Sequence, residues 1–365
     1  MNRLFGDIYK GRRVLITGHT GFKGSWLALW LCGMGAEVVG YSLAPDTEPN
    51  HFDLLDINCD SIIGDIRDRD KFKSVILKYQ PEIIFHLAAQ PLVRRGYREP
   101  VNTFETNVMG TINLLDSCRQ PTSVRAVLVV TSDKCYENQQ LNRGYHENDP
   151  LGGYDPYSAS KGCAEIVTSS YRRSFFPTDQ FGKRHNVLIA SARAGNVIGG
   201  GDWSEDRLIP DIVKAVNKNE KVIIRNPVST RPWQHVLESL TGYLILGQKI
   251  LTGDVDCATA WNFGPYMDGE LSVENMIKKM QQVWDKIDYR VSESNEMHEA
   301  KLLQLDSTNA RTILGWNQVW GADETVEKTC KWYKRFYQKQ EVNTAQQILE
   351  YVETARVKKL DWALQ

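Results

Sequence analysis

The chain has 365 residues and a formal net charge of −1, with 44 Lys and Arg against 45 Asp and Glu. This balance leaves no excess charge to attract nucleic acid or an anionic membrane, so we expect neither as a partner. Hydrophobic residues make up 42% of the chain and charged residues 24%, which excludes disordered, collagenous and low-complexity classes. The length suggests about two domains, or one large α/β unit with an addition.

The cysteines and the apolar runs indicate the cellular compartment in which we expect the protein. The seven cysteines are scattered, without C-x-x-C pairs or companion histidines, so we expect neither a disulfide framework nor a metal site. The N-terminal segment has no apolar stretch of signal-peptide type, and no later run reaches the ~20 residues that span a bilayer. These features predict a cytoplasmic protein.

In the first half of the chain, short β-rich apolar runs alternate with longer amphipathic stretches. This alternation is typical of βαβ units and of a parallel sheet buried on both faces. The expected strands are residues 14–17, 37–41, 61–63, 83–87, 126–131 and 186–192. The expected helices are residues 23–34, 69–79, 101–118 and 156–175. We therefore predict an α/β protein with a Rossmann-type, doubly wound parallel sheet.

Beyond Gly195 the regular alternation is lost. A smaller, mixed α/β substrate-binding lobe is predicted there, so that residues 1–194 form mainly the dinucleotide-binding domain and residues 195–365 mainly the lobe. Strand-like runs at 222–225 and 260–263 are separated by a helical run at 236–251. The lobe is therefore expected to be built from more than one stretch, and some segments to cross back to the first domain. A further helix is expected over 272–287, and the tail at 325–360 reads as amphipathic helix.

A glycine turn with Gly18, Gly21 and Gly24 follows the first strand and opens the first long helix. Glycine permits a tight turn and close approach of the backbone to a pyrophosphate, and the helix start supplies oriented amides. A plain strand-to-helix turn is the alternative, because three glycines alone are weak evidence. Their place in the first βαβ unit favours dinucleotide binding.

The end of the second strand bears on which dinucleotide is bound. The carboxylate that commonly contacts the adenosine ribose is missing from residues 39–45, and so is an arginine for a 2′-phosphate. NAD is the better expectation on this pattern. After the third strand, Asp65 is a candidate adenine contact, with an exposed turn as the alternative. Small residues after the fourth strand leave room for a cofactor, whereas His86 is expected to be a packed histidine.

Tyr157 and Lys161 lie four residues apart, on one face of a helix that Asp155 is placed to cap. A nearby ammonium, together with the positive ring of an oxidised nicotinamide, would lower the pKa of the phenol and make it a base for a sugar hydroxyl. Tyrosine and lysine at this spacing are common on helix surfaces. The pair gains weight from the glycine turn.

Ser132, Asp133 and Lys134 follow the fifth strand, at the sheet edge where ligands bind in open α/β folds. Ser132 can orient a hydroxyl, while Asp133 and Lys134 place an acid and a possible base side by side. A polar turn leaving a strand is the alternative. Alcohol oxidation needs only the Ser, Tyr and Lys, but removal of water from a sugar needs a further proton donor and acceptor. The sequence has candidates for both.

These motifs together resemble the extended short-chain dehydrogenase/reductase family acting on nucleotide-sugars. The resemblance is carried by the glycine turn, by Ser132 with Tyr157 and Lys161, and by residues 194–203 and 231–236, and it runs over nearly the whole chain. Within the family, the pattern is most similar to the 4,6-dehydratases of CDP-D-glucose.

The resemblance implies an NAD-dependent intramolecular oxidation, dehydration and reduction. CDP-D-glucose would become CDP-4-dehydro-6-deoxy-D-glucose plus water, for deoxysugar synthesis of the O-antigen or lipopolysaccharide kind. Tyr157 would take the 4-hydroxyl proton while hydride passes to NAD, Lys134 would remove the C5 proton, and Asp133 would protonate the departing 6-hydroxyl. An ordinary lysine titrates near ~10.4, and dTDP-glucose dehydratases have glutamate at this position. A protonated Lys134 paired with Asp133, with another residue or water as base, therefore stays open.

The resemblance also implies the remaining site residues and a homodimer. The substrate set is Gln90, Asn196, Arg207 and Arg231. The cofactor set is Gly18, Thr20, Gly21, Phe22, Gly24, Asp65, Ile66, Leu87, Ala88, Ala89, Asn107, Tyr157 and Lys161. The dimer would form through helices 101–118 and 156–175. A 4-epimerase, a dehydratase for a dTDP-, GDP- or UDP-hexose, and a catalytically silent dinucleotide-binding scaffold are the alternatives.

Overall fold

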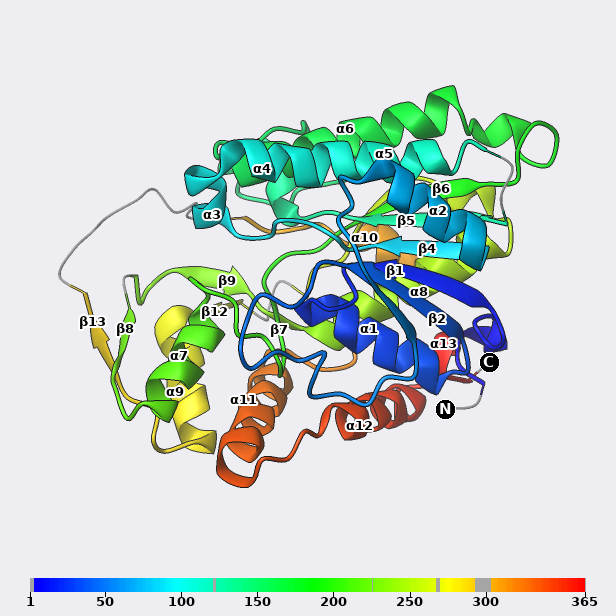
Figure 1. The fold of residues 1–365 in the computed structure, drawn as a ribbon. Coiled ribbons are helices and arrows are strands. Elements are labelled where there is room, and N and C mark those ends of the chain that lie inside the picture. The colour runs from blue at the N-terminus through cyan, green and yellow to red at the C-terminus, as the bar shows by residue number, and fades with distance from the viewer. Residues whose placement is uncertain (1–2, 121–122, 225, 267–269, 293–302, 365) are drawn as a thin grey trace.

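The computed structural model describes residues 3–120, 123–224, 226–266, 270–292 and 303–364. A large sheet lies between two layers of helices, and a smaller group of strands and helices lies at one side of it (Figure 1). Of the helices in the described residues, none is both long and apolar enough to cross a membrane.

The large sheet is parallel throughout and has the strand order β3-β2-β1-β4-β5-β6-β11. Its strands are β1 Arg13–Thr17, β2 Glu37–Ser42, β3 Asp60–Ile63, β4 Ile83–His86, β5 Ala126–Val130, β6 Leu188–Arg193 and β11 Ala260–Asn262. The six strands expected in the first half are confirmed. The strand order reverses between β1 and β4, so the crevice at this switch point lies next to the glycine turn.

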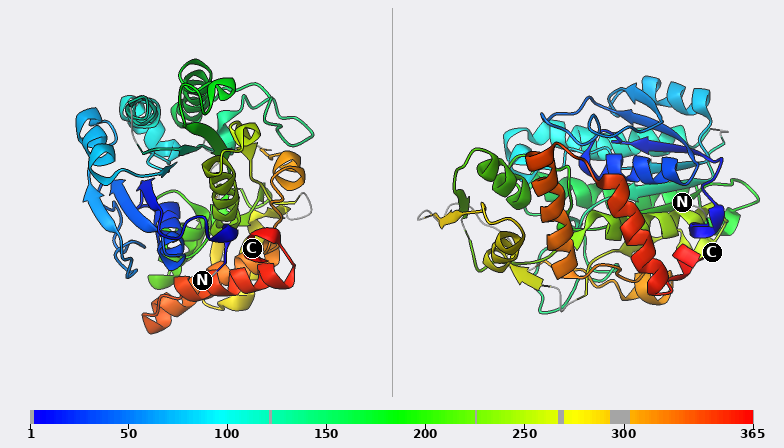
Figure 2. Two further views of the ribbon diagram at one scale, coloured as in Figure 1. Left: turned by 90° about the vertical axis from the view of Figure 1, so that its right-hand side faces the viewer. Right: turned by 90° about the horizontal axis from the view of Figure 1, so that it is seen from below.

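The central strands of the sheet are buried on both faces, because neighbouring residues of β1, β2, β4, β5 and β6 enter different cores. Val14 and Ile16 belong to one core, and Leu15 to the other. On one face lie α2 Arg69–Tyr79, α4 Pro100–Phe104, α5 Gly110–Ser117 and α6 Pro156–Ser174. On the other side lie α1 Phe22–Gly33, α8 Val236–Leu251, α12 Thr344–Val357 and α13 Asp361–Leu364 (Figures 1 and 2). The predicted doubly wound architecture is therefore confirmed.

The helix expected over 101–118 is not regular. A π-helical turn, Glu105–Met109, separates α4 from α5. Such widened turns insert an extra residue into a helix and occur often at functional sites. Asn107 lies within this turn.

The smaller group of elements contains three two-stranded pairings: β10 with β7, β12 with β9, and β13 with β8. Its elements are β7 Val197–Ile198, α7 Leu208–Asn217, β8 Val222–Ile224, β9 Thr230–Pro232, β10 Gln234–His235, β12 Glu270–Ser272, α9 Val273–Val283, β13 Tyr289–Val291 and α11 Ala322–Lys339. Residue 225, predicted to extend β8, lies outside the described residues. Short connecting helices are η1 Phe5–Asp7, α3 Val93–Arg98, η3 Asp133–Cys135, η4 Thr178–Gln180, η5 Val255–Cys257 and α10 Thr308–Thr312.

Two expectations for the second half were wrong in detail. The run 260–263 was expected in the smaller lobe, but β11 pairs with β6 at the edge of the large sheet, and α8 packs against β5 and β6. The tail is two helices, because Gln340 adopts the left-handed conformation (φ 57°) and ends α11. The division at residue 194 stays a prediction, and chain beyond it contributes to the large sheet.

Candidate active site

In the glycine turn, Gly18 and Gly24 are packed too closely to admit a side chain. Gly18 has φ 77°, and a Cβ atom there would lie 2.7 Å from the backbone nitrogen of Ala88. A Cβ atom on Gly24 would lie 2.0 Å from the carbonyl oxygen of Gly18. Gly21 precedes α1, whose first turn begins with Phe22. The turn therefore joins the ends of β1 and β4 to the start of a helix, which is the arrangement that fits a pyrophosphate.

The end of β2 and the turn after β3 lie beside this glycine turn. The hydroxyl of Thr20 donates to the carbonyl of Leu43 (2.9 Å) and lies 2.9 Å from Oγ of Ser42. Asp65 forms an ion pair with Arg67 (2.6 Å), and the hydrogen bond from Arg67 lowers the pKa of this carboxyl. Because Arg67 already occupies the carboxylate, an adenine contact from Asp65 stays a prediction.

The end of β4 is anchored to β1. The backbone nitrogen of Leu87 donates to the carbonyl of Thr17 (3.0 Å), and that of Ala88 to the Thr17 hydroxyl (3.2 Å). His86 is buried between hydroxyls of Thr17 and Thr111, and burial lowers its pKa to about 3. It is an uncharged packed histidine, as expected. Ala89 follows in the same loop, and Ile66 packs over α5, where a Cβ on Gly110 would lie 2.7 Å from it.

Asn107 connects the π-helical turn to α6 and to the loop after β4. Its Nδ2 donates to Oγ of Ser160 (2.8 Å) and to the carbonyl of Gln90 (3.1 Å), and its Oδ1 accepts from the Gln90 backbone (2.8 Å). The Gln90 side chain is itself held, since it donates to Thr103 and accepts from the backbone of Leu92. Asn107 thus supports the helix that carries Tyr157, whereas a substrate contact from Gln90 stays a prediction.

Ser132, Asp133 and Lys134 form the turn that leaves β5. Ser132 caps η3, because its Oγ accepts from the backbone of Lys134 (3.2 Å), and it donates to Oδ1 of Asp133 (2.8 Å). Ser132 and Asp133 are buried, and Lys134 is half-buried. The turn therefore holds a hydroxyl, a carboxyl and an amine at one strand end.

Tyr157 and Lys161 face this turn from α6, which Asp155 caps as expected (3.0 Å to the Ser158 backbone). Burial raises the pKa of Tyr157 to about 12, although a hydrogen bond with Ser132 lowers it. Burial lowers the pKa of Lys161 to about 8. In the polypeptide by itself, desolvation of the phenolate outweighs the hydrogen bond with Ser132 and the charge of Arg207. A lower phenol pKa was expected with oxidised nicotinamide bound, and it stays a prediction.

Besides Gln90, the other three predicted substrate residues lie at separate places. Arg207 precedes α7 and pairs with Asp202 (2.9 Å), and its charge acts on Tyr157 to lower the phenol pKa. Asn196 follows β6 in a left-handed conformation (φ 48°). Arg231 lies in β9, within the smaller group of elements. Contact of these three with substrate stays a prediction.

Two neighbours of the turn formed by Ser132, Asp133 and Lys134 were not predicted from the sequence: Lys23 and Gly195. The ammonium of Lys23 lies 3.3 Å from the hydroxyl of Tyr243 on α8. Burial lowers the pKa of Lys23 to about 7, and Arg207, Asp133 and Lys161 also act on it. A Cβ on Gly195 would lie 2.0 Å from Oδ2 of Asp133. Both residues stand inside motifs that the sequence singled out, but only the fold brings them to Asp133.

The comparisons with known proteins agree with this geometry. Residues 15–329 match the family model described as GDP-mannose 4,6 dehydratase. The chain belongs to this family. Over 331 residues it is 50% identical to a CDP-glucose 4,6-dehydratase from Salmonella typhimurium, an alignment that covers 90% of this chain and 92% of that relative.

Solved structures share the fold at lower sequence identity. A UDP-glucose 4-epimerase from Thermotoga maritima superposes with a TM-score of 0.77 at 20% identity, covering 89% of this chain and all of that one. A dTDP-glucose 4,6-dehydratase from Bacillus anthracis, solved with NAD, has a TM-score of 0.72 at 17% identity, covering 90% of this chain and 98% of that one. These similarities confirm a Rossmann-type fold that epimerases and dehydratases share.

Proposed function

We propose that the protein is an NAD-dependent nucleotide-sugar 4,6-dehydratase that converts CDP-D-glucose to CDP-4-dehydro-6-deoxy-D-glucose and water. The observation that supports dehydration is the position of the Asp133 carboxyl, which lies in the same buried turn as Ser132. It supplies a proton donor beyond the hydroxyl, phenol and amine that a simple alcohol oxidation needs. The Salmonella relative supports CDP-D-glucose as the substrate.

The cofactor residues fit a dinucleotide. The turn formed by Gly18, Gly21 and Gly24 would hold the pyrophosphate at the start of α1, and the neutral end of β2 at Ser42 favours NAD. When bound there, NAD would supply the hydride acceptor for C4 of the sugar and the hydride donor for C6, and its positive ring would favour the phenolate form of Tyr157.

The chain's own groups would carry the proton transfers. Ser132 orients the 4-hydroxyl and Tyr157 takes its proton, with Lys161 stabilising the phenolate. Oxidation at C4 makes the C5 proton acidic, and Lys134 stands beside Asp133 to remove it. Asp133 then protonates the departing 6-hydroxyl, so that water leaves. Arg207 and Arg231 are positively charged candidates for the diphosphate of the substrate.

Turnover of isotope-labelled substrate tests this proposal. With CDP-D-glucose that carries deuterium at C4, the product should have lost one water and should carry the label at C6 of the same molecule. Label lost to the medium would contradict the mechanism. A panel of dTDP-, GDP- and UDP-hexoses, with and without added NAD, tests the nucleotide: faster turnover of another nucleotide would overturn the CDP assignment.

A 4-epimerase on the same scaffold is the alternative, and it would also use Ser132, Tyr157 and Lys161. It needs no acid at Asp133. Release of a C4 epimer without loss of water would establish it. Cofactor binding without turnover of any nucleotide-hexose would instead support a silent scaffold.

We further propose a cytoplasmic homodimer that serves deoxysugar synthesis of the O-antigen or lipopolysaccharide kind. Support for the dimer is an apolar outer face on α4 and the π-helical turn, where Val101 is 69% and Met109 48% exposed. A groove beside them is lined by Pro100, Val101, Phe104, Glu105, Val108, Met109 and Cys163. Light scattering should show a dimer, and Val101→Glu with Met109→Glu should give a monomer. A monomeric wild-type protein would contradict the dimer.

A further inference from the structure

Two charged residues lie next to the turn of Ser132, Asp133 and Lys134, which we call the catalytic turn. The proposed mechanism uses neither of them. Glu165 lies on α6, the helix of Tyr157 and Lys161, and Arg193 is the last residue of β6. Oε2 of Glu165 lies 2.8 Å from Nη2 of Arg193, and the two side chains are only 3% and 4% exposed. Burying such a pair costs solvation of both charges, so further hydrogen bonds are needed to offset that cost.

These hydrogen bonds reach the residues on either side of the catalytic turn. Oε1 of Glu165 accepts from the hydroxyl of Thr131, the residue before Ser132. Nη1 of Arg193 donates to the hydroxyl of Tyr136 (2.7 Å), which follows η3, and the guanidinium lies over the same ring, 5.0 Å from its centre. The pair therefore holds both ends of the turn.

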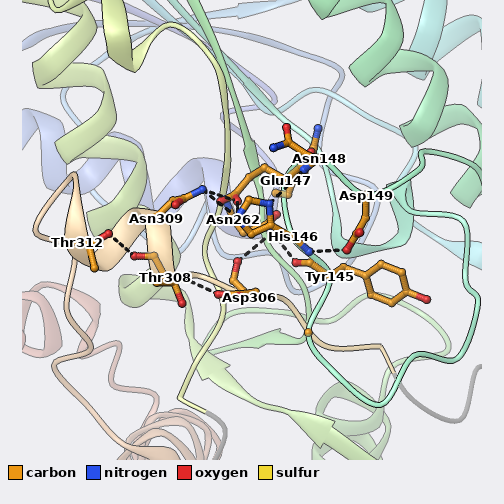
Figure 3. Close-up of polar contacts among 12 residues, drawn as sticks. Tyr145, His146, Glu147, Asn148, Asp149, Asn262, Asp306, Thr308, Asn309 and Thr312 are labelled. Carbon is orange, nitrogen blue, oxygen red and sulfur yellow. Dashed lines mark hydrogen bonds and ion pairs between the residues drawn. The ribbon is translucent and has the colours of Figure 1, made fainter.

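A second layer of polar contacts fixes Tyr136 and Arg193 from the outside. The hydroxyl of Tyr136 donates to Oδ1 of Asn262 (2.8 Å), and Arg193 donates to the carbonyl of Glu147 (2.9 Å). Asn262 in turn donates to the carbonyls of Tyr145 (2.8 Å) and Asp306 (3.1 Å). Figure 3 shows Asn262 beside Asp306 and beside the loop that carries Tyr145 and Glu147.

We propose that Glu165 and Arg193 are positioning residues, which clamp Thr131 and Tyr136 and so fix the turn of Ser132, Asp133 and Lys134 against the helix that carries Tyr157 and Lys161. The inference rests on the proposed function, because the reaction gives the turn its purpose. Neither residue touches the reacting atoms in this scheme. Each acts through the turn.

The carboxylate of Glu165 has a second effect, on Lys161, which precedes it by four residues on α6 and so lies on the same face of the helix. The groups that interact electrostatically with Lys161 are Glu165 on α6, the thiol of Cys135 from η3, His86 on β4 and Lys23 on α1. Tyr157 lies four residues before Lys161 on the same helix. Burial lowers the pKa of Lys161, and the charge of Glu165 opposes this lowering. Removing that charge should therefore lower the pKa of Lys161 further and leave less of the ammonium form at neutral pH.

Two variants separate the clamp from the charge. Thr131→Val combined with Tyr136→Phe removes the hydrogen bonds from both ends of the turn and keeps the buried ion pair. Glu165→Gln keeps the shape of the side chain and removes its charge. Thr168→Val is the control, because Thr168 is a buried residue of the same helix whose hydroxyl donates to the Ala164 carbonyl (2.7 Å), away from the turn.

Two measurements are made on each folded variant: single-turnover reduction of NAD by CDP-D-glucose between roughly pH 6 and 9, and amide hydrogen exchange of residues 132–136 without substrate. The Thr131→Val, Tyr136→Phe protein should reduce NAD about tenfold more slowly, while the substrate concentration that gives the half-maximal single-turnover rate stays within about twofold of wild type. Its turn should exchange faster. Glu165→Gln should also move the basic limb of the pH profile to lower pH, and Thr168→Val should change neither readout.

Wild-type exchange and wild-type rate in the Thr131→Val, Tyr136→Phe protein would overturn the clamp. An unshifted pH profile in folded Glu165→Gln would overturn the electrostatic effect on Lys161. If that variant does not fold, the same profile is measured for Glu165→Asp with Thr131→Val. The basic limb should then stay in place because the charge remains, and a shifted limb would overturn the electrostatic effect. If the wild-type protein reduces no NAD with any nucleotide-hexose, the proposed function fails, and hydrogen exchange still decides the clamp.

Discussion

Gly195 and the carboxylate of Asp133 are in direct contact: a methyl group on Gly195 would lie 2.0 Å from Oδ2 and 2.1 Å from Cγ of Asp133. Gly195 follows β6, and Asp133 follows the neighbouring strand β5. Because Gly195 has no side chain, the carboxylate of Asp133 can lie directly against the segment that follows β6. Arg193 lies only two positions before Gly195. The same short segment therefore contacts Asp133 through Gly195 and Tyr136, at the end of the turn, through Arg193.

Replacing Gly195 by alanine should therefore slow the loss of water. The added methyl group forces the Asp133 carboxylate to move, and misplacing a catalytic group by about 1 Å can cost on the order of 100-fold in rate. We expect reduced cofactor to form at a less altered rate and to accumulate. Stopped-flow absorbance of the reduced nicotinamide measures both steps. Gly321→Ala is the control, since nothing lies within 4 Å of the added methyl group; equal effects of the two changes would argue against the contact.

Asp133→Asn removes the acid and keeps a side chain of similar size. The amide oxygen can still accept the hydrogen bond from Ser132, so oxidation at C4 should proceed. Protonation of the 6-hydroxyl should slow by about 10²–10⁴-fold, the usual contribution of a general acid. Product analysis should show reduced cofactor with little 6-deoxy sugar. Dehydration at the wild-type rate would remove Asp133 from the mechanism.

Tyr157→Phe should block the first oxidation. The phenol is the group placed to take the 4-hydroxyl proton, and its loss should lower the rate of NAD reduction by about 10²–10⁴-fold. Binding of NAD, followed by fluorescence titration, should change by less than about twofold, since that binding is assigned chiefly to the glycine turn. Cofactor reduction at the wild-type rate in this variant would defeat the assigned role.

Four buried histidines predict a loss of stability in acid. Burial lowers the pKa of His51, His86 and His235 to about 3 each and that of His19 to about 4, below the ~6.5 of an unfolded histidine. The unfolded chain therefore binds more protons between about pH 6.5 and 3, and the free energy of unfolding falls as pH decreases through this window. Lowering the pH from about 7.5 to 5.5 should cost roughly 1.4 kcal/mol for each histidine.

Urea unfolding at the two pH values measures this loss. His51 is held between Ser25 and Thr344, each 2.8 Å away, so His51→Gln should lower stability at both values. The same change should reduce the difference between pH 7.5 and 5.5 by about 1.4 kcal/mol. An unchanged difference would show that His51 is not the uncharged core residue described above.

Local sequence patterns determined the elements and the chemistry that each strand end carries. The apolar runs predicted the six strands of the first half because strands of a sheet covered on both faces are apolar at most positions. The glycine turn, Ser132 with Asp133, and Tyr157 with Lys161 could all be identified because each motif lies within a few residues of chain. The same local reasoning failed at residues 260–263 and at the tail, where pairing with β6 and one left-handed residue decided the outcome.

Relationships between distant residues were decided by the tertiary structure alone. Lys23 lies against Tyr243 of α8, Gly195 against Asp133, and Arg193 against Glu165, and no spacing along the chain indicates these contacts. The π-helical turn at Asn107 belongs to the same class, since its amide bonds Gln90 and Ser160. The physical reason is that the hydrophobic pattern determines only which face of a strand or helix is buried. Which residue pairs with a buried charge, and which atom packs against a glycine, depends on how the strands and helices are placed beside one another.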